Sequence, residues 1–291
     1  MEFAISVLLS GISVGGQYAL IAIGYTMVYG ILRLINFAHG DVFMVAGLSL
    51  IYLSASMPLQ VALPVVLILT VLLGFLIERV AYKPLRSAPR MSVMISAIGV
   101  SYLLQNTATY VTGGQPMNYP TIPFLSDMVT IAGATTSMVT VVTPFLVLAL
   151  VIGLVQLINH TKIGMAMRAV AKDFETSQLM GIKINSVISM TFIIGSFLAA
   201  VGSMLYFTNY TYSIPTAGAM PGLKAFVAAV FGGIGSIPGA VIGALIIGIC
   251  ENIIKALGYT TFSDAFTFAL LIVILLFKPT GLFGEKISEK V

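Results

Sequence analysis

Long apolar stretches alternate with short polar connections along most of the chain. A helix needs about 20 apolar residues to cross the roughly 30 Å hydrocarbon core of a bilayer. On this measure the pattern predicts about nine transmembrane segments, at residues 5–31, 38–56, 61–80, 92–112, 138–158, 186–208, 222–236, 239–257 and 262–278. The seventh segment is short and Gly-rich, so a half-crossing is the alternative there.

Composition supports a membrane protein. The chain is 58% hydrophobic and only 8% charged, whereas soluble domains carry roughly a quarter charged residues. Stretches such as 145–158 are too continuously apolar for the alternating strands of a transmembrane barrel. The predicted fold class is therefore all-α polytopic membrane protein.

One polar segment interrupts the apolar pattern just past the middle of the chain, at residues 160–185, and carries six charged residues. Thr161 can cap a helix start, residues 166–180 contain neither Gly nor Pro, and Gly181 is placed as a helix stop. The segment therefore predicts a short polar helix at the membrane surface.

Basic residues predict the orientation, because Lys and Arg concentrate in cytoplasmic loops. With the N-terminus outside, twelve of the fourteen Lys and Arg lie inside, and only Lys224 and Lys255 do not. This count predicts an N-out, C-in topology. It also explains the net charge of +4, so binding to nucleic acid is not needed as an explanation. The location that follows is the inner (plasma) membrane.

The chain is predicted to be one transmembrane domain, residues 1–291, with two groups of four spans around a fifth. Its predicted parts are a first group (1–112), an outer loop (113–137), the fifth span (138–158), a cytoplasmic segment (159–185), a second group (186–278) and a cytoplasmic tail (279–291). The two groups would enter the membrane from opposite sides, so inverted repeats are a hypothesis, although no shared sequence motif supports them. Tyr119 and Phe124 suggest that the outer loop packs over the outer mouth, and a plain connector is the alternative.

No catalytic residues, metal site or cofactor site is expected. The chain has no phosphate-binding loop, metalloprotease motif or nucleophile elbow. His39 and His160 are far apart, and Cys250 is the single cysteine, so neither a zinc site nor a disulfide within the chain is expected.

The charges of the spans are expected near span ends. Asp41 and Asp264 open helices, where an acid suits the helix dipole, and Glu251 and Lys255 form an i,i+4 pair near an outer end. The deep parts of the spans then hold only Gln17, Gln105, Asn106 and hydroxyl groups. This distribution argues against coupling to a proton or sodium gradient.

Glycines at four-residue spacing predict close helix packing, at Gly15 in the first span and at Gly235, Gly239 and Gly243 later. The most polar insertion among the early spans is NFAHGD, residues 36–41, expected at the cytoplasmic end between the first two spans. In a structural interpretation, Asn36 or Asp41 caps a helix and Gly40 permits the turn. In a functional one, His39 and Asp41 gate the path or relay protons.

Five motifs stand together in order: 15–41, 78–86, 164–182, 222–244 and 278–284. In this arrangement the chain closely resembles, over nearly its whole length, the permease subunit of bacterial branched-chain amino acid ABC importers, of the H-type Liv permeases. The NFAHGD motif and the AFVAAVFGGIGSIPGA run are the most specific. The motif residues Asn36, His39, Gly40 and Asp41 are then expected near the path or gate.

The resemblance implies a subunit that works with a second permease, two cytoplasmic ATPases and an external solute-binding protein, and that crosses the lipid bilayer with them. ATP and Mg would be used by the ATPases, so this chain would itself be no enzyme and would bind no cofactor. The segment after the fifth span resembles the coupling loop that docks on the ATPase. The residues that match its pattern are Gly164, Arg168, Ala169, Asp173, Gly181 and Ile182.

The implied substrates are leucine, isoleucine and valine. Related permeases for urea or short amides are an alternative that the sequence does not separate. The second hypothesis, from a different class, is an ion-coupled secondary carrier that works alone.

Overall fold

The computed structural model describes residues 2–86, 88–131 and 133–284. Lys286 and Lys290, which belong to the predicted cytoplasmic tail, lie outside the described residues. The helices of the first half are α1 (Glu2–Leu32), α2 (His39–Ser56), α3 (Leu59–Ile77), a π-helical turn (Glu78–Tyr82), a short 3-10 turn (Lys83–Leu85), α4 (Arg90–Thr112) and α5 (Met138–His160). Those of the second half are α6 (Lys162–Lys172), α7 (Phe174–Leu179), α8 (Ile184–Tyr210), α9 (Ala219–Gly232), α10 (Ile237–Ala256), a 3-10 turn (Thr260–Phe262) and α11 (Ser263–Phe277).

A helix stands at each of the nine predicted spans. Six of the described helical stretches are long and apolar enough to cross a membrane: Glu2–Leu32, Leu59–Leu85, Met138–His160, Ile184–Tyr210, Ile237–Ala256 and Thr260–Phe277. The polytopic, all-α class is therefore confirmed. The count of nine stays a prediction, because α2, α4 and α9 are not among the six.

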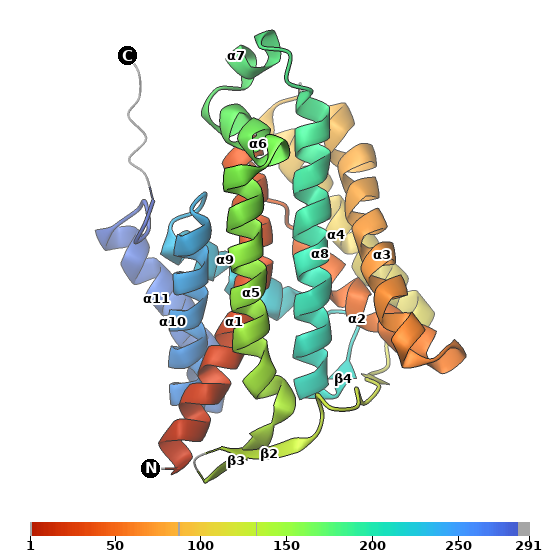
Figure 1. The fold of residues 1–291 in the computed structure, drawn as a ribbon, viewed down its shortest axis with the longest axis vertical. Coiled ribbons are helices and arrows are strands. Elements are labelled where there is room, and N and C mark those ends of the chain that lie inside the picture. Colours follow the sequence, from red (N-terminus) through yellow and green to blue (C-terminus); the bar gives the residue numbers. More distant parts are fainter. Residues whose placement is uncertain (1, 87, 132, 285–291) are drawn as a thin grey trace.

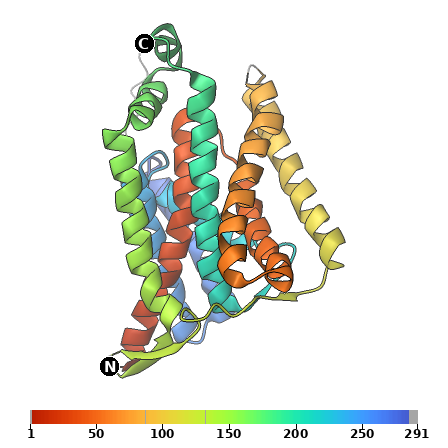
Figure 2. The same ribbon diagram turned by 45° about the vertical axis from the view of Figure 1, so that its right-hand side comes forward.

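The long helices run side by side, and α1 lies in their middle (Figure 1). It packs against α5, α8, α9 and α10, and nearly all its residues from Gly11 to Val28 are buried. The N-terminal end of α1 lies at one end of the bundle with the hairpin of β2 (Met128–Ile131) and β3 (Ala134–Ser137), whereas α6 and α7 lie at the opposite end (Figures 1 and 2).

Glycine permits the close approach of α1 and α10. A Cβ added to Gly15 would lie 2.8 Å from the Cα of Leu245, and one added to Gly243 would collide with the carbonyl of Ala228 on α9. A Cβ added to Gly239 would lie 2.5 Å from the carbonyl oxygen of Gly232. The packing role predicted for these glycines is confirmed. It is wrong for Gly235, which has a φ of +103° and shapes the turn before α10, because a Cβ added there would have no neighbouring heavy atom within 4 Å.

Helices α2 and α9 begin inside the bundle rather than at its ends. Before each of them, a long helix ends at a residue with left-handed backbone, Arg33 after α1 and Thr211 after α8, and both have a φ of +54°. A stretch without helix follows, at residues 34–38 and 212–218. The N-termini of α2 and α9 then meet, because a Cβ on Gly40 would stand 2.7 Å from the carbonyl oxygen of Gly218.

Contacts around this meeting point are reciprocal. The difference in residue number between Gly40 and Gly218 is the same as that between Met44 and Gly222. We call this difference the shift along the chain. A Cβ added to Gly222 would lie 2.9 Å from the Cα of Gly40, and one added to Gly218 would lie 2.9 Å from the Cβ of Met44. The same shift carries Arg33 onto Thr211 and residues 59–77, the whole of α3, onto 237–255 in α10.

The outer loop is held against the bundle. Its strand β1 (Met117–Asn118) pairs with β4 (Tyr212–Ser213), and the N–H of Tyr119 donates to the carbonyl of Thr211 at 2.9 Å. The Tyr119 ring packs on Phe207, and its burial raises the pKa of its hydroxyl. Phe124, in contrast, is exposed. The prediction of a packed loop is therefore confirmed at Tyr119.

Candidate functional site

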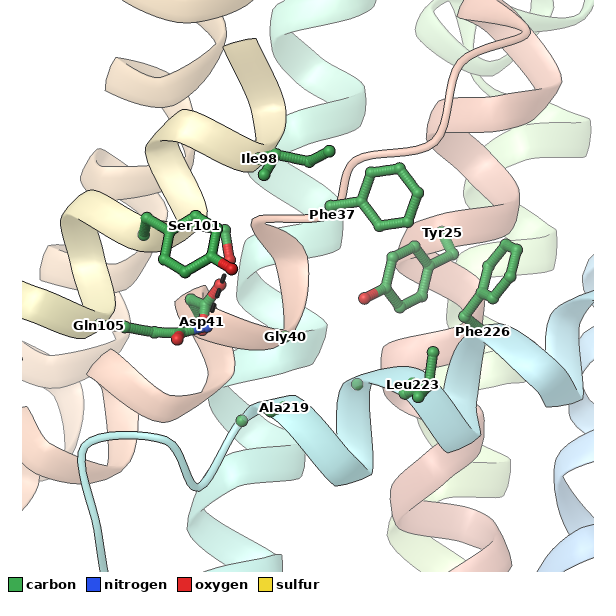
Figure 3. A pocket seen from close by; sticks show the side chains of 13 residues that line it. Tyr25, Phe37, Gly40, Asp41, Ile98, Ser101, Gln105, Ala219, Leu223 and Phe226 are labelled. Atoms are coloured by element: carbon green, nitrogen blue, oxygen red, sulfur yellow. Dashed lines mark hydrogen bonds between the residues drawn. The ribbon is translucent and has the colours of Figure 1, made fainter. Parts of the chain in front are cut away.

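A cavity of about 290 Å³ lies where α2 and α9 meet, between these helices, α1 and α4 (Figure 3). We call it the crossing cavity. Gly40, Gly218 and Gly222 form part of its wall with bare backbone. Its polar side chains are Tyr25, Asp41, Ser101, Tyr102 and Gln105, and its apolar ones include Phe37, Ile98, Leu223 and Phe226.

Asp41 is the single acidic side chain of this lining. It is only 3% exposed. Its carboxylate accepts a hydrogen bond from Gln105 Nε2 at 2.9 Å and another from the Ser101 hydroxyl. No Lys, Arg or His within the described ranges forms an ion pair with it. A buried carboxylate held by two neutral donors keeps acceptor positions for a further, positively charged partner.

The position of Asp41 follows from the discontinuous path of the chain. After α1 ends at Leu32, residues 33–38 turn back into the bundle, and α2 starts beside Gly24 and Tyr25 of α1. Eight residues separate Gly24 from the end of α1, or about 12 Å of helix. The predicted location of NFAHGD at the cytoplasmic end is therefore wrong, because the motif lies inside the bundle.

The predicted capping roles of this motif are also wrong. Ala38 occupies the N-cap position of α2, without a side-chain hydrogen bond. Asn36 instead accepts from the Tyr82 hydroxyl at 2.9 Å. His39 is buried between α1 and α8, with its ring against Gly24 and Gly195. Asp41 does open α2, as predicted, but its side chain faces the crossing cavity.

Helix α3 continues into the π-helical turn that carries Glu78 and Tyr82. Glu78 is fully buried, pairs with Arg86, and accepts from the Ser189 hydroxyl of α8 at 2.7 Å. Arg86 also donates to Asn185. The motif at 78–86 is thereby joined to the start of α8 and, through Asn36, to the NFAHGD motif.

A second group of charges lies between α1, α9, α10 and the start of α11, with Lys224 and Glu251 buried and Lys255 and Asp264 partly exposed. Glu251 is 1% exposed and accepts from Lys224 at 2.8 Å, from Lys255 at 2.6 Å and from the Tyr18 hydroxyl at 3.1 Å. Lys224 also pairs with Asp264 at 2.6 Å. The predicted i,i+4 pair of Glu251 and Lys255 is confirmed, and both residues lie in the last six residues of α10. Two cations and two anions meet here, so the cluster is balanced.

The polar segment folds into two helices rather than one. Thr161 caps α6 by accepting from the Gly164 N–H at 3.1 Å, as predicted. The chain leaves helical geometry at Asp173, which caps α7 by accepting from the Thr176 N–H at 3.0 Å. Gly181 ends α7 with a φ of +80°, and the N–H groups of Gly181 and Ile182 bond back to Gln178 and Ser177. The helix stop predicted at Gly181 is confirmed.

The residues matched to a coupling loop differ in accessibility. Arg168 is exposed and donates to Asn159 at 2.9 Å. Gly164 is buried. A Cβ there would collide with the backbone of Ile158, so the glycine lets α6 fold back on α5. Ala169 and Ile182 are half-buried, and Asp173 and Gly181 are exposed. Two apolar side chains that the motif did not single out, Leu179 and Met180, are 87% and 78% exposed.

A further cavity of about 370 Å³ lies between α2, α3 and α4. Its lining includes Leu48, Leu69 and Leu104 and no charged residue. It therefore offers nothing to fix a charged group.

The comparisons with known proteins agree with this architecture. The family model described as "Branched-chain amino acid transport system / permease component" matches residues 7–275. The chain belongs to this family. A permease subunit is a transport component, so the family assigns this chain to transport rather than catalysis. The family and the apolar helices together indicate a multi-pass membrane protein.

Relatives extend over the full length. The high-affinity branched-chain amino acid transport system permease protein BraD of Pseudomonas aeruginosa is 40% identical, over 98% of this chain and 97% of its own. The corresponding permease LivH of Escherichia coli K12 is 42% identical, over 97% of this chain and 96% of its own. The ribose import permease RbsC of Haemophilus influenzae is 26% identical, over 92% of this chain and 83% of its own.

Proposed function

We propose that this chain is a membrane-spanning subunit of an ATP-driven importer for branched-chain amino acids, and that it forms part of the translocation path. The crossing cavity is the observation that carries the proposal, in a chain whose full-length relatives are named for this transport. The cavity joins one buried carboxylate to apolar walls. An amino acid with a branched apolar side chain offers complementary groups, a cation and a hydrocarbon tail.

The proposed topology has nine crossings, with the N-terminus outside and the C-terminus in the cytoplasm of the inner membrane. Helices α2 and α9 complete their crossings together with residues 33–38 and 211–218. The reciprocal contacts of Gly40 with Gly222 and of Met44 with Gly218 support an inverted repeat about the meeting point of α2 and α9. Substrate sites of transporters commonly lie where such repeats meet.

The proposed assembly contains a second permease, two cytoplasmic ATPases and an external solute-binding protein. One side of the crossing cavity is formed by large exposed side chains of α4 and α9, among them Tyr102 and Leu223. A second permease against this side would close the cavity. At the opposite end from the outer loop, α6 and α7 present Arg168, Leu179 and Met180 to the ATPases. ATP and Mg would be bound by those partners.

Reconstitution tests the proposal. The importer would be assembled in vesicles from this chain, a second permease, two ATPases and a solute-binding protein. ATP inside the compartment that corresponds to the cytoplasm should then drive leucine uptake, and removal of the ATPases should abolish it. Uptake of urea in place of leucine would reassign the substrate. Uptake by this chain alone, driven by an ion gradient, would overturn the proposal.

A further inference from the structure

The crossing cavity has an electrostatic asymmetry that the proposed transport function does not by itself require. Two helix N-termini meet there, and the shift along the chain that carries Gly40 onto Gly218 carries Asp41 onto Ala219. The N-terminus of α2 therefore has a carboxylate, whereas that of α9 has none. Both Asp41 and Ala219 line the cavity (Figure 3).

Each side of the cavity favours a different charge. The N-terminus of a helix carries about half a positive charge, which favours an anion. On α2 the carboxylate of Asp41 more than offsets this partial charge, and the side chain has no cationic partner among the described residues. On α9 no acid stands in the first turn, where the N–H groups of Ala219 and Gly222 donate to the carbonyls of Thr216 and Gly218. Interactions between charges are also stronger here than in water, because the surroundings are apolar.

We infer that the crossing cavity is a binding site for one zwitterionic α-amino acid in a fixed orientation. Asp41 receives the α-ammonium group, and the N-terminus of α9 receives the α-carboxylate. Phe37, Ile98 and Phe226 contact the side chain. Gln105 and Ser101 are positioning residues, since their hydrogen bonds fix the Asp41 carboxylate.

The dimensions agree with a single small metabolite. Binding cavities for small molecules begin at about 300 Å³, and this one holds about 290 Å³. The charge pattern also separates the candidate substrates. Urea and short amides carry no cation, so they would leave the buried Asp41 carboxylate unpaired. The inference rests on the proposed transport function and names the part of the chain that recognises its substrate.

A cysteine reporter tests the site directly. In the assembled importer, Ile98→Cys would be combined with Cys250→Ser, so that a maleimide labels one position in the cavity wall. We expect leucine to slow the labelling. Isocaproate, which is leucine without its ammonium group, and isoamylamine, which lacks the carboxylate, should need at least about tenfold higher concentrations, or about 1.4 kcal/mol in affinity.

Two variants assign the ends of the zwitterion. Asp41→Asn keeps the shape of the side chain and removes its charge, so the concentration of leucine that half-protects the cysteine should rise at least about tenfold. Protection by isocaproate should not weaken, because this anion loses a repulsive neighbour. Ala219→Asp places a carboxylate at the start of α9, so protection by leucine should weaken and protection by isoamylamine should persist. Asp127→Asn, the same change at an exposed position of the outer loop, should alter neither.

The outcomes separate the site from the transport function. Leucine uptake by the importer without any protection of the cysteine would overturn the site and leave the proposed function standing. Protection without uptake would support the site and count against the function. Equal protection curves for leucine in the Asp41→Asn importer and in the importer that keeps Asp41 would overturn the assignment of the ammonium group.

Discussion

Gly40 at the start of α2 and Gly218 just before α9 touch through bare backbone. A Cβ added to Gly40 would lie 2.7 Å from the carbonyl oxygen of Gly218, and one added to Gly218 would collide with the carbonyl of Gly40. Side chains at these positions would force the two helices apart. The contact thus fixes the distance between two helix N-termini and, with it, the width of the crossing cavity.

Replacement of Gly40 by Ala should destabilise the protein. The added methyl group meets the backbone of Gly218, which cannot move aside as a flexible side chain could. Overpacking of this kind costs about 1–3 kcal/mol, so we expect a lower Tm for the purified subunit in detergent. Gly99→Ala on α4 is the matched control, because no heavy atom lies within 4 Å of its added Cβ. Equal Tm values for the two variants would contradict the close contact.

The buried charge cluster yields a second prediction. Glu251→Gln would leave Lys224 and Lys255 with only Asp264 as a counter-charge. Removal of one partner from a buried ion pair costs about 3–5 kcal/mol, so the Tm should fall steeply. Glu175→Gln, at an exposed position of α7, should stay within about 0.5 kcal/mol of the unmodified protein.

A double variant checks the reason for that loss. Glu251→Gln combined with Lys255→Met leaves Lys224 paired with Asp264 and restores the balance of charge. We expect part of the lost stability to return. A double variant no more stable than Glu251→Gln would show that lost packing, rather than an unpaired cation, causes the change.

The sequence was sufficient to predict the class of the fold and the places of its helices, because apolar runs of membrane length are a local property. It was also sufficient for the caps at Thr161 and Gly181, which depend on neighbouring residues. The depth of α2 and α9 was not predictable, because it depends on where the chain turns back into the bundle. Lys224 and Glu251 were missed as partners for a similar reason, since they come from different helices.

The crossing cavity could be anticipated only in part. NFAHGD was singled out by its polarity, but its wrong placement at the membrane surface hid its contact with α4. One local signal was present, because Ser101 and Gln105 stand four residues apart and therefore share a face of α4. The chain offered no such signal for Gly218, whose role depends on the approach of another backbone.

Replacement of Gly181 by Val should weaken the association with the ATPases more than it affects insertion. Gly181 has a φ of +80° and open space around its Cα, so a side chain would meet strain rather than a collision. For a branched side chain the left-handed backbone costs at least about 1–2 kcal/mol. The amount of ATPase that co-purifies with the subunit is the measurement. Gly181→Asn, which tolerates this backbone, should retain the ATPase; equal losses in both variants would refute the argument from strain.

Reversal of charge at Arg168 should uncouple transport from ATP hydrolysis. Its guanidinium is exposed on α6 and anchored by Asn159, so Arg168→Glu would present an acid where the docked ATPase is expected to meet a base. Leucine uptake per ATP hydrolysed should fall several-fold. Arg168→Gln keeps a donor for Asn159 without the charge. Its leucine uptake per ATP hydrolysed should lie between those of Arg168→Glu and the unmodified importer. Unchanged coupling in Arg168→Glu would mean that Arg168 is not part of the docking surface.

Asp173 can support docking through its charge or through its cap, and two substitutions separate these roles. Its carboxylate accepts from the N–H and hydroxyl of Thr176, at 3.0 and 2.6 Å, and thereby begins α7. Asp173→Ala removes the cap and should destabilise α7 by about 0.5–2 kcal/mol, whereas Asp173→Asn keeps a capping side chain without the charge. If the cap matters, only Asp173→Ala should lose co-purifying ATPase. Equal losses in both variants would instead assign the effect to the charge, because α7 would still be capped in Asp173→Asn.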